Sequence, residues 1–131
     1  MILVDTTVWI DFFANRNTAH AFYLSRLIEQ SDDLYLCGIV LTEILQGIRN
    51  AKEHHQAEEI LNSLLFLDMS RSTYILAADI FRNLRARGIT IRKTLDCMIA
   101  AVAIENNISL LHNDRDFDPI QKYCGLKIVK L

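Results

Sequence analysis

The sequence predicts an α/β fold, an α/β/α sandwich built on a mostly parallel sheet of four or five strands. Short apolar runs suited to buried strands recur along the chain, and stretches with helical spacing of apolar residues separate them. Strands that alternate with helices form right-handed crossover units, which produce a parallel sheet. No internal repeat or domain boundary is visible, so we expect residues 1–131 to form a single domain.

The expected elements follow one another in a regular order. Strands are expected at residues 1–4, 34–37, 108–111 and 126–129, with a short edge strand at 66–69. Helices are expected as one to two turns at residues 8–13, then at 19–29 with Thr18 as cap and Ser31-Asp32-Asp33 as its end, after Gly38, and at 51–65, 72–87 and 94–106. The pattern thus gives each strand a helical connection to the next.

Three of these helices carry defined sequence signals. The helix after Gly38 has the apolar stripe Leu41, Ile44, Leu45 and Ile48. The helix at 72–87 has the stripe Tyr74, Ala77, Ala78, Phe81 and Leu84 and stops at Gly88. Thr94 is expected to cap the helix that follows it, and that helix is apolar nearly all round, which predicts a central position.

Composition excludes several classes of protein. Hydrophobic residues make up 51% and charged residues 23%, with one Pro and four Gly, so disorder is not expected. No apolar run approaches the roughly 20 residues of a membrane span, and no secretion signal opens the chain, so we expect no membrane association and a cytoplasmic location. The three cysteines lack zinc or disulfide spacing and are expected to be buried small hydrophobes.

The net charge of −2 argues alone against a nucleic-acid partner. If four of the 16 acids are gathered in one pocket, however, 14 basic groups face 12 acidic ones over the rest of the surface. An anionic polymer could therefore bind around such a pocket with salt dependence.

Two acids in the first half of the chain are expected near the carboxyl ends of strands, where open α/β sheets bind ligands. Asp5 directly follows the first strand, and its alternative role is to cap the next helix. Glu43 lies about 150° around its helix from the apolar stripe, which by itself indicates a solvent-facing residue. It is also expected in the first turn of a helix that starts from a strand end.

Two further acids come from the second half of the chain. Asp96 heads the face formed by Ile99, Ala100 and Ala103, where a solvated acid is not expected, although a capping role is the alternative. Asp114 follows the strand at 108–111 within three residues, in an Asn/Asp-rich stretch that also reads as a turn. Asp118, before Pro119, is interpreted as a turn residue.

Four segments therefore deliver carboxylates to one edge of the sheet. Two such groups about 5 Å apart repel by roughly 3 kcal/mol at an effective dielectric near 20, so a positive partner is needed. No lysine or arginine recurs at the strand ends as a fixed partner. An all-oxygen ligand set favours Mg²⁺ or Mn²⁺, which can activate water for attack on a phosphodiester.

At these residues the chain resembles the PIN-domain family, in particular the VapC-like ribonuclease toxins of type II toxin–antitoxin systems. The motifs are Leu3-Val4-Asp5-Thr6-Thr7, Thr42-Glu43 with Gly47, Asp96 with Ala100-Ala101 and Ala103, and Asn113-Asp114-Arg115-Asp116-Phe117. Their order and spacing cover almost the whole chain and are more specific than any one motif. One departure is His112, where members of the group often have Thr or Ser; a satisfied structural histidine is the expected reading.

The resemblance implies a PIN-like fold and a metal-dependent endoribonuclease acting as a toxin. It implies that Asp5, Glu43, Asp96 and Asp114 are the catalytic and metal-binding acids, with Asp116 as a secondary metal ligand. Thr6 or Thr7 would support them by hydrogen bonding, and Arg92, Lys93 and Arg115 are expected to contact RNA. The resemblance further implies a homodimer and a cognate antitoxin.

Other readings of the acidic pocket fit less well. A receiver domain needs its acids in another order, and a haloacid-dehalogenase-type phosphatase needs an Asp where Thr7 stands. No Gly-x-Gly-x-x-Gly follows the first strand, which excludes a Rossmann dinucleotide site. A catalytically silent PIN fold that acts as an interaction module and a housekeeping RNA-processing nuclease remain as alternatives.

Overall fold

The computed structural model describes residues 1–30 and 33–131 and contains one parallel sheet flanked by helices. Its strands are β1 (Ile2–Val4), β2 (Leu34–Cys37), β3 (Leu65–Leu67) and β4 (Ser109–Leu111). The strand order is β3-β2-β1-β4, and every neighbouring pair is parallel. The predicted α/β class and parallel sheet are confirmed, and β3 is the edge strand that the sequence predicts.

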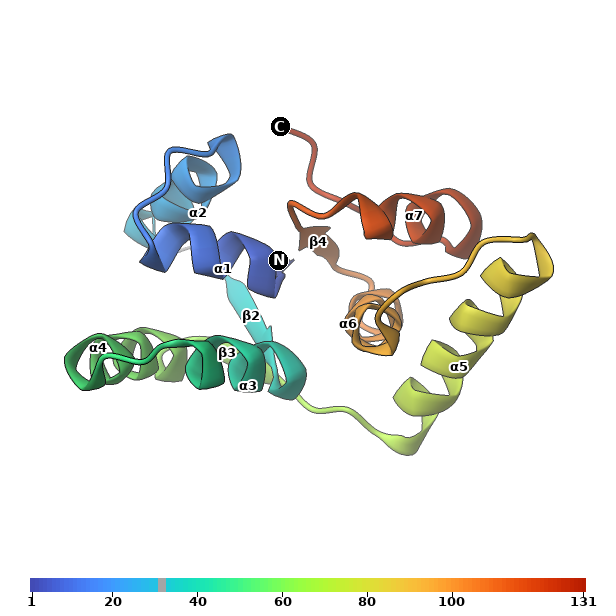
Figure 1. Cartoon of the computed structure of the whole chain (residues 1–131), viewed down its shortest axis with the longest axis horizontal. Helices are drawn as coiled ribbons and strands as arrows, with labels where there is room; N and C mark the ends of the chain where they lie inside the picture. The colour runs from blue at the N-terminus through green and yellow to red at the C-terminus, as the bar shows by residue number, and fades with distance from the viewer. Residues whose placement is uncertain (31–32) are drawn as a thin grey trace.

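The helices form two groups, one on each side of the sheet (Figure 1). The first group is α1 (Thr6–Phe13), α2 (Ala19–Glu29), α3 (Gly38–Gly47) and α4 (Ala51–Asn62). The second is α5 (Arg71–Ala86), α6 (Thr94–Glu105) and α7 (Asp118–Cys124), with the short 3₁₀ helix η1 (Arg115–Phe117) before α7. The apolar residues of β1, β2, β4 and α6 meet in one core, in which Leu3, Leu110 and Ile99 are fully buried.

The sequence-predicted strand at 126–129 is wrong. This segment follows α7 and touches β4 through a single bridge, Leu110 to Ile128. The Leu110 N–H donates to the Lys127 carbonyl over 2.9 Å, and the Val129 N–H donates to the Leu110 carbonyl over 3.0 Å. Pairing at one residue does not extend into a ladder, so the sheet has four strands in the part of the chain that is described.

The predicted buried face of α5 is rotated relative to the observed one. Buried residues of α5 are Thr73, Ala77, Ile80 and Leu84, whereas Tyr74 is 50% exposed and Ala78 is also exposed. The periodicity of apolar residues missed this face because it begins with a threonine, whose hydroxyl donates to Glu105 of α6. A satisfied hydroxyl can be buried without a large penalty.

Several element boundaries also differ from expectation. α1 starts at Thr6 rather than at residue 8, because Asp5 caps it. α6 starts at Thr94, so the cap position is Lys93 and the predicted Thr94 cap is wrong. Ser31 and Asp32, expected to end α2, lie outside the described residues, and α2 itself ends at Glu29. Within residues 1–30 and 33–131, no helix has both the length and the apolarity needed to cross a bilayer.

Candidate active site

Asp5 stands at the carboxyl end of β1 and is 2% exposed. Its Oδ2 accepts the Thr7 N–H over 3.1 Å and the Thr7 hydroxyl over 2.6 Å, so the acid caps α1 while lying in the core of the site. Burial raises the pKa of Asp5 and the charge of Glu43 adds to the rise, whereas the hydrogen bonds from Thr7 oppose it. The helix-cap role and a role in the site are therefore compatible.

Thr7 connects the end of β1 to the loop after β4. Besides donating to Asp5, its hydroxyl oxygen accepts the Asn113 N–H over 3.1 Å. The Asp5 N–H in turn donates to the Leu111 carbonyl over 2.9 Å. These contacts fix the loop that carries Asp114 against the strand end that carries Asp5.

Glu43 reaches the same region from α3. The Thr6 hydroxyl donates to Glu43 Oε1 over 2.7 Å, and the glutamate is half-buried. Because α3 begins at Gly38, Glu43 stands in the second helical turn rather than in the first turn that the sequence predicts. The threonines next to Asp5 thus each hold one acid, Thr6 binding Glu43 and Thr7 binding Asp5.

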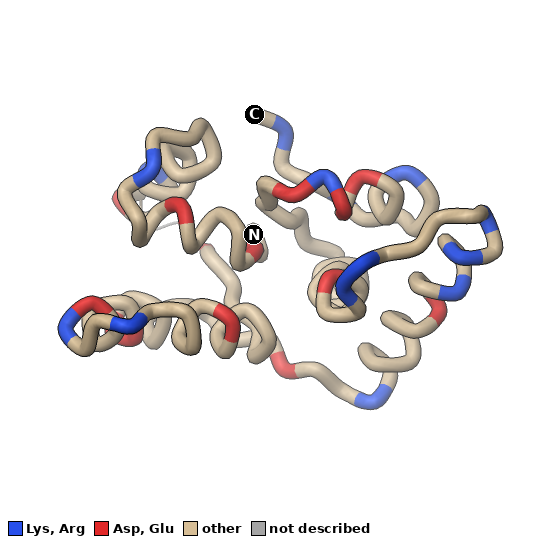
Figure 2. The backbone as a smooth tube through the Cα atoms, viewed as in Figure 1, with Lys and Arg blue, Asp and Glu red and all other residues tan. Residues whose placement is uncertain are grey.

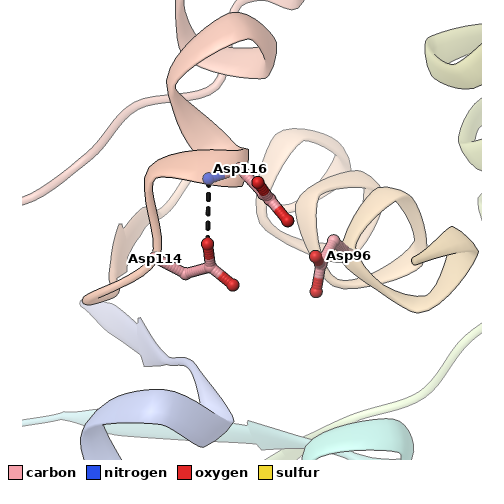
Figure 3. Close-up of side chains that lie close together, drawn as sticks. All are labelled: Asp96, Asp114 and Asp116. Atoms are coloured by element: carbon pink, nitrogen blue, oxygen red, sulfur yellow. Dashed lines mark hydrogen bonds between the residues drawn. The ribbon is translucent and has the colours of Figure 1, made fainter. Parts of the chain in front are cut away.

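Three acids form the closest group of carboxylates. Asp96 at the start of α6 and Asp114 and Asp116 around η1 each offer one ligand atom, and these atoms lie within 4.8 Å of one another (Figure 3). The Asp116 N–H donates to Asp114 Oδ1 over 2.9 Å, which fixes the turn between the two acids. Among the residues that the structure describes, Asp5 and Glu43 are not part of this group.

Asp96 is the most buried acid of the three. It is 6% exposed, and its Oδ2 has no hydrogen-bond partner within residues 1–30 and 33–131. The pKa of Asp96 is raised to about 7: burial is the main cause, the charges of Asp5, Asp114 and Asp116 contribute to the rise, and Lys93 opposes it. A buried carboxylate oxygen without a partner lowers the stability of the fold unless a cation or a proton binds to it.

Arg92 already neutralises part of this group. Its Nε and Nη2 donate to Asp116 Oδ2 over 3.1 and 2.9 Å. Figure 2 shows basic positions interleaved with acidic ones around the start of α6 and around η1. The sequence predicts no lysine or arginine at the strand ends as a fixed partner, and Arg92 does not contradict this because it lies in the connector before α6. From there it binds Asp116, a contact that the strand ends alone do not reveal.

The donor set fits a hard divalent cation. All three grouped residues offer carboxylate oxygens, which suit Mg²⁺ or Mn²⁺ better than softer metals. The partnerless Asp96 Oδ2 supplies a second observation that points to a bound cation, because it is buried with nothing to satisfy it. The site can thus hold a metal ion, because Arg92 neutralises only part of the negative charge of the three acids.

The PIN domain family matches residues 2–123. The VapC ribonuclease Mb1587 of Mycobacterium bovis is 33% identical over 129 residues, which cover 97% of this chain and 96% of that protein. The ribonuclease VapC1 of Methanocaldococcus jannaschii is 31% identical over 134 residues, covering 97% of this chain and 85% of that protein.

The chain belongs to the PIN-domain family, in its VapC group. Solved structures agree in fold. VapBC2 from Rickettsia felis, bound to a DNA fragment from their promoter, has a TM-score of 0.78 at 19% identity and covers 100% of this chain and 99% of its own. VapBC-1 from nontypeable Haemophilus influenzae has a TM-score of 0.75 at 23% identity and covers 99% of this chain and 98% of its own.

Sequence reasoning missed one acid of this PIN domain. Asp11 is 7% exposed, and its carboxylate accepts from Arg16 over 3.0 Å and from the Asn113 side chain over 3.3 Å. Asp11 stands four residues after Thr7 on α1, so both face the loop after β4. That spacing was the available signal, but the surrounding run of aromatic residues hid it.

His112 has a structural role in the PIN domain. Its Nδ1 accepts the Asp114 N–H over 3.1 Å, and its ring packs 4.9 Å from that of Phe117. Burial lowers the pKa of His112, which keeps the ring neutral and Nδ1 able to accept. These contacts give His112 the expected structural role and help to hold Asp114 in place. The expectation of a satisfied histidine is wrong for Nε2, which is buried and has no hydrogen-bond partner among the described residues.

Proposed function

We propose that this protein is a metal-dependent endoribonuclease that acts as the toxin of a toxin–antitoxin pair. The observation that carries the proposal is the group of Asp96, Asp114 and Asp116 with the partnerless Asp96 Oδ2 among them. Relatives of matching length are named ribonucleases and supply the substrate class, RNA. We take residues 1–131 as one catalytic unit.

Asp96, Asp114 and Asp116 would hold Mg²⁺ or Mn²⁺, with Asp5 and Glu43 completing the acidic side of the site. A metal ion bound there supplies an activated water and stabilises the leaving oxygen of a phosphodiester. Asp5 offers Oδ1 to the site, since Thr7 engages its Oδ2. Glu43 offers Oε2, since Thr6 engages its Oε1.

The RNA backbone would contact the basic residues that flank these acids. Arg92 and Lys93 directly precede α6, and Arg115 lies between Asp114 and Asp116. All three are exposed. Basic side chains beside an acidic metal site can bind the phosphates on either side of the one that is cleaved. We assign Arg92, Lys93 and Arg115 to substrate binding for this reason.

Two protein partners belong to the proposal. A cognate antitoxin is supported by structural neighbours that are toxin–antitoxin complexes, among them one from Klebsiella pneumoniae. A homodimer is supported by the exposed apolar side chains of Phe66, Tyr74 and Leu95, which line one hollow next to Glu43. A second copy of the chain would cover this face.

RNA cleavage by purified variants tests the catalytic assignment. Asp5→Asn and Asp96→Asn are expected to lower the rate of Mg²⁺- or Mn²⁺-dependent cleavage by roughly a hundredfold or more, because each removes a charge that the metal needs. Asp118→Asn is the matched control: it makes the same change at an exposed position outside the group and should cleave at the wild-type rate.

Wild-type cleavage rates in Asp5→Asn or Asp96→Asn would contradict the assignment. A wild-type protein that gains no thermal stability from Mg²⁺ or Mn²⁺ and cleaves no RNA would instead be a silent interaction module. The neighbouring reading frame separates a toxin from a housekeeping nuclease, because a short upstream gene with a DNA-binding amino-terminal half is expected for a toxin.

A further inference from the structure

Arg92 binds one oxygen of Asp116 through two of its nitrogens. Nε and Nη2 both donate to a single oxygen, Asp116 Oδ2, over 3.1 and 2.9 Å. No hydrogen bond joins Arg92 to Asp116 Oδ1 in the described part of the chain, so one oxygen of this carboxylate serves the arginine. Asp116 is 19% exposed in its side chain and Arg92 is 74% exposed.

Both partners of this pair are anchored through their neighbours. Ile91, directly before Arg92, is 5% exposed and packs in the core. Asp116 is fixed by its N–H bond to Asp114 Oδ1. The pair therefore joins two separate segments beside the acidic group, and the guanidinium can swing on its own side chain without moving either backbone.

More than one acid stabilises the charged form of Arg92. The hydrogen bond to Asp116 and the charge of that residue raise the pKa of Arg92, and the charges of Asp114 and Asp96 add to the rise. Among the described residues, Arg92 is thus the basic side chain that is hydrogen-bonded to the acidic group when no metal ion is bound. A divalent cation placed among the same carboxylates repels the guanidinium and competes with it for the carboxylate of Asp116.

We infer that Arg92 is a metal-responsive phosphate-binding residue: it neutralises Asp116 in the metal-free protein and turns to an RNA phosphate when a divalent cation binds the acidic group. The inference rests on the proposed function. Arg92 suits this exchange because its guanidinium forms paired hydrogen bonds to carboxylates and phosphates alike, and because most of its side chain already faces solvent. Binding of metal and the ion pair would then oppose each other, each weakening the other by the same factor.

Calorimetric titration with Mn²⁺ or Ca²⁺ alone tests the first half of the inference. Arg92→Gln is expected to bind the ion roughly fivefold or more tightly than wild type, because the ion no longer competes with the guanidinium. Arg71→Gln is the matched control, since it makes the same change at an exposed arginine at the start of α5, next to the end of α6 that lies opposite Asp96, and it should leave the affinity for the ion close to that of wild type. Circular dichroism checks that both variants are folded.

Fluorescence anisotropy with a labelled single-stranded RNA tests the second half, with the RNA checked for integrity on a gel. Arg92→Gln is expected to weaken RNA binding roughly tenfold in Ca²⁺ but less than about twofold in EDTA, because the guanidinium reaches the phosphate only when the ion is bound. Equal losses in Ca²⁺ and EDTA would overturn the inference and make Arg92 a static contact.

Weaker binding of metal by Arg92→Gln would also overturn the inference, because it would mean that Arg92 holds Asp116 in place for the ion. If the proposed function itself is wrong, the experiments give a third result. In that case the wild-type protein shows no heat of Mn²⁺ binding and Asp96→Asn behaves like wild type.

Discussion

At the scale of single residues, the buried carboxyl group of Asp96 has a strongly raised pKa. Its pKa is about 7 in the folded protein against an ordinary value of 3.8, with burial as the main cause. The protonated form is therefore favoured in the fold, and the metal-free protein should lose stability as the pH rises from 3.8 through about 7. Asp5 shifts in the same direction and adds to this loss.

Asp96→Asn should remove much of this pH dependence in EDTA. At about pH 8 the free energy of unfolding of the variant is expected to exceed that of wild type by about 2 to 4 kcal/mol, since each pKa unit corresponds to about 1.4 kcal/mol. At about pH 4 the two proteins should be alike. Urea denaturation at both pH values measures this, and a wild-type curve that is equally stable at both would contradict it.

At the scale of elements, α6 owes its position to α5. Thr73, 2% exposed in the first turn of α5, donates to Glu105 at the end of α6 and also accepts the Ser70 N–H over 3.1 Å. Ser72 donates to the other oxygen of Glu105 over 2.7 Å. The helix that presents Asp96 is thus tied at its opposite end.

Thr73→Val, which keeps the shape of the side chain, should lower the free energy of unfolding by about 1 to 2 kcal/mol, because the hydroxyl makes two contacts that valine cannot. Thr90→Val makes the same change at an exposed position and should alter stability by less than about 0.5 kcal/mol. Urea denaturation of both variants decides the matter. Equal effects would show that the link between α5 and α6 contributes nothing.

At the scale of the whole molecule, the proposed dimer can be tested by placing one charge on the face that the second copy would cover. Phe66 is 50% exposed on the edge strand β3, and Phe22 is 61% exposed on α2. Phe66→Glu is expected to elute as a monomer in size-exclusion chromatography with light scattering, because a buried charge without a partner disfavours the interface. Phe22→Glu should remain a dimer, and a monomeric wild-type protein would contradict the proposal.

Much of this fold could be predicted because local pattern and tertiary structure agree. Apolar runs in the sequence predict β1, β2 and α2. The ends of the predicted strands then indicate which acids lie at the edge of the sheet. The hydrogen bonds of Thr73 and Arg92 could not be predicted in this way, since their partners Glu105 and Asp116 lie 32 and 24 residues away. Pairing between side chains of distant segments depends on how those segments pack, which periodicity does not record.

The three grouped acids lie late in the chain, between residues 96 and 116. A ribosome therefore synthesises Asp5 and Glu43 long before any of the three emerges. An incomplete polypeptide that ends within α5 would contain two of the proposed catalytic acids but none of the group that binds the ion. For a protein proposed to poison its own cell, harmfulness would then begin only after residue 116 has been synthesised.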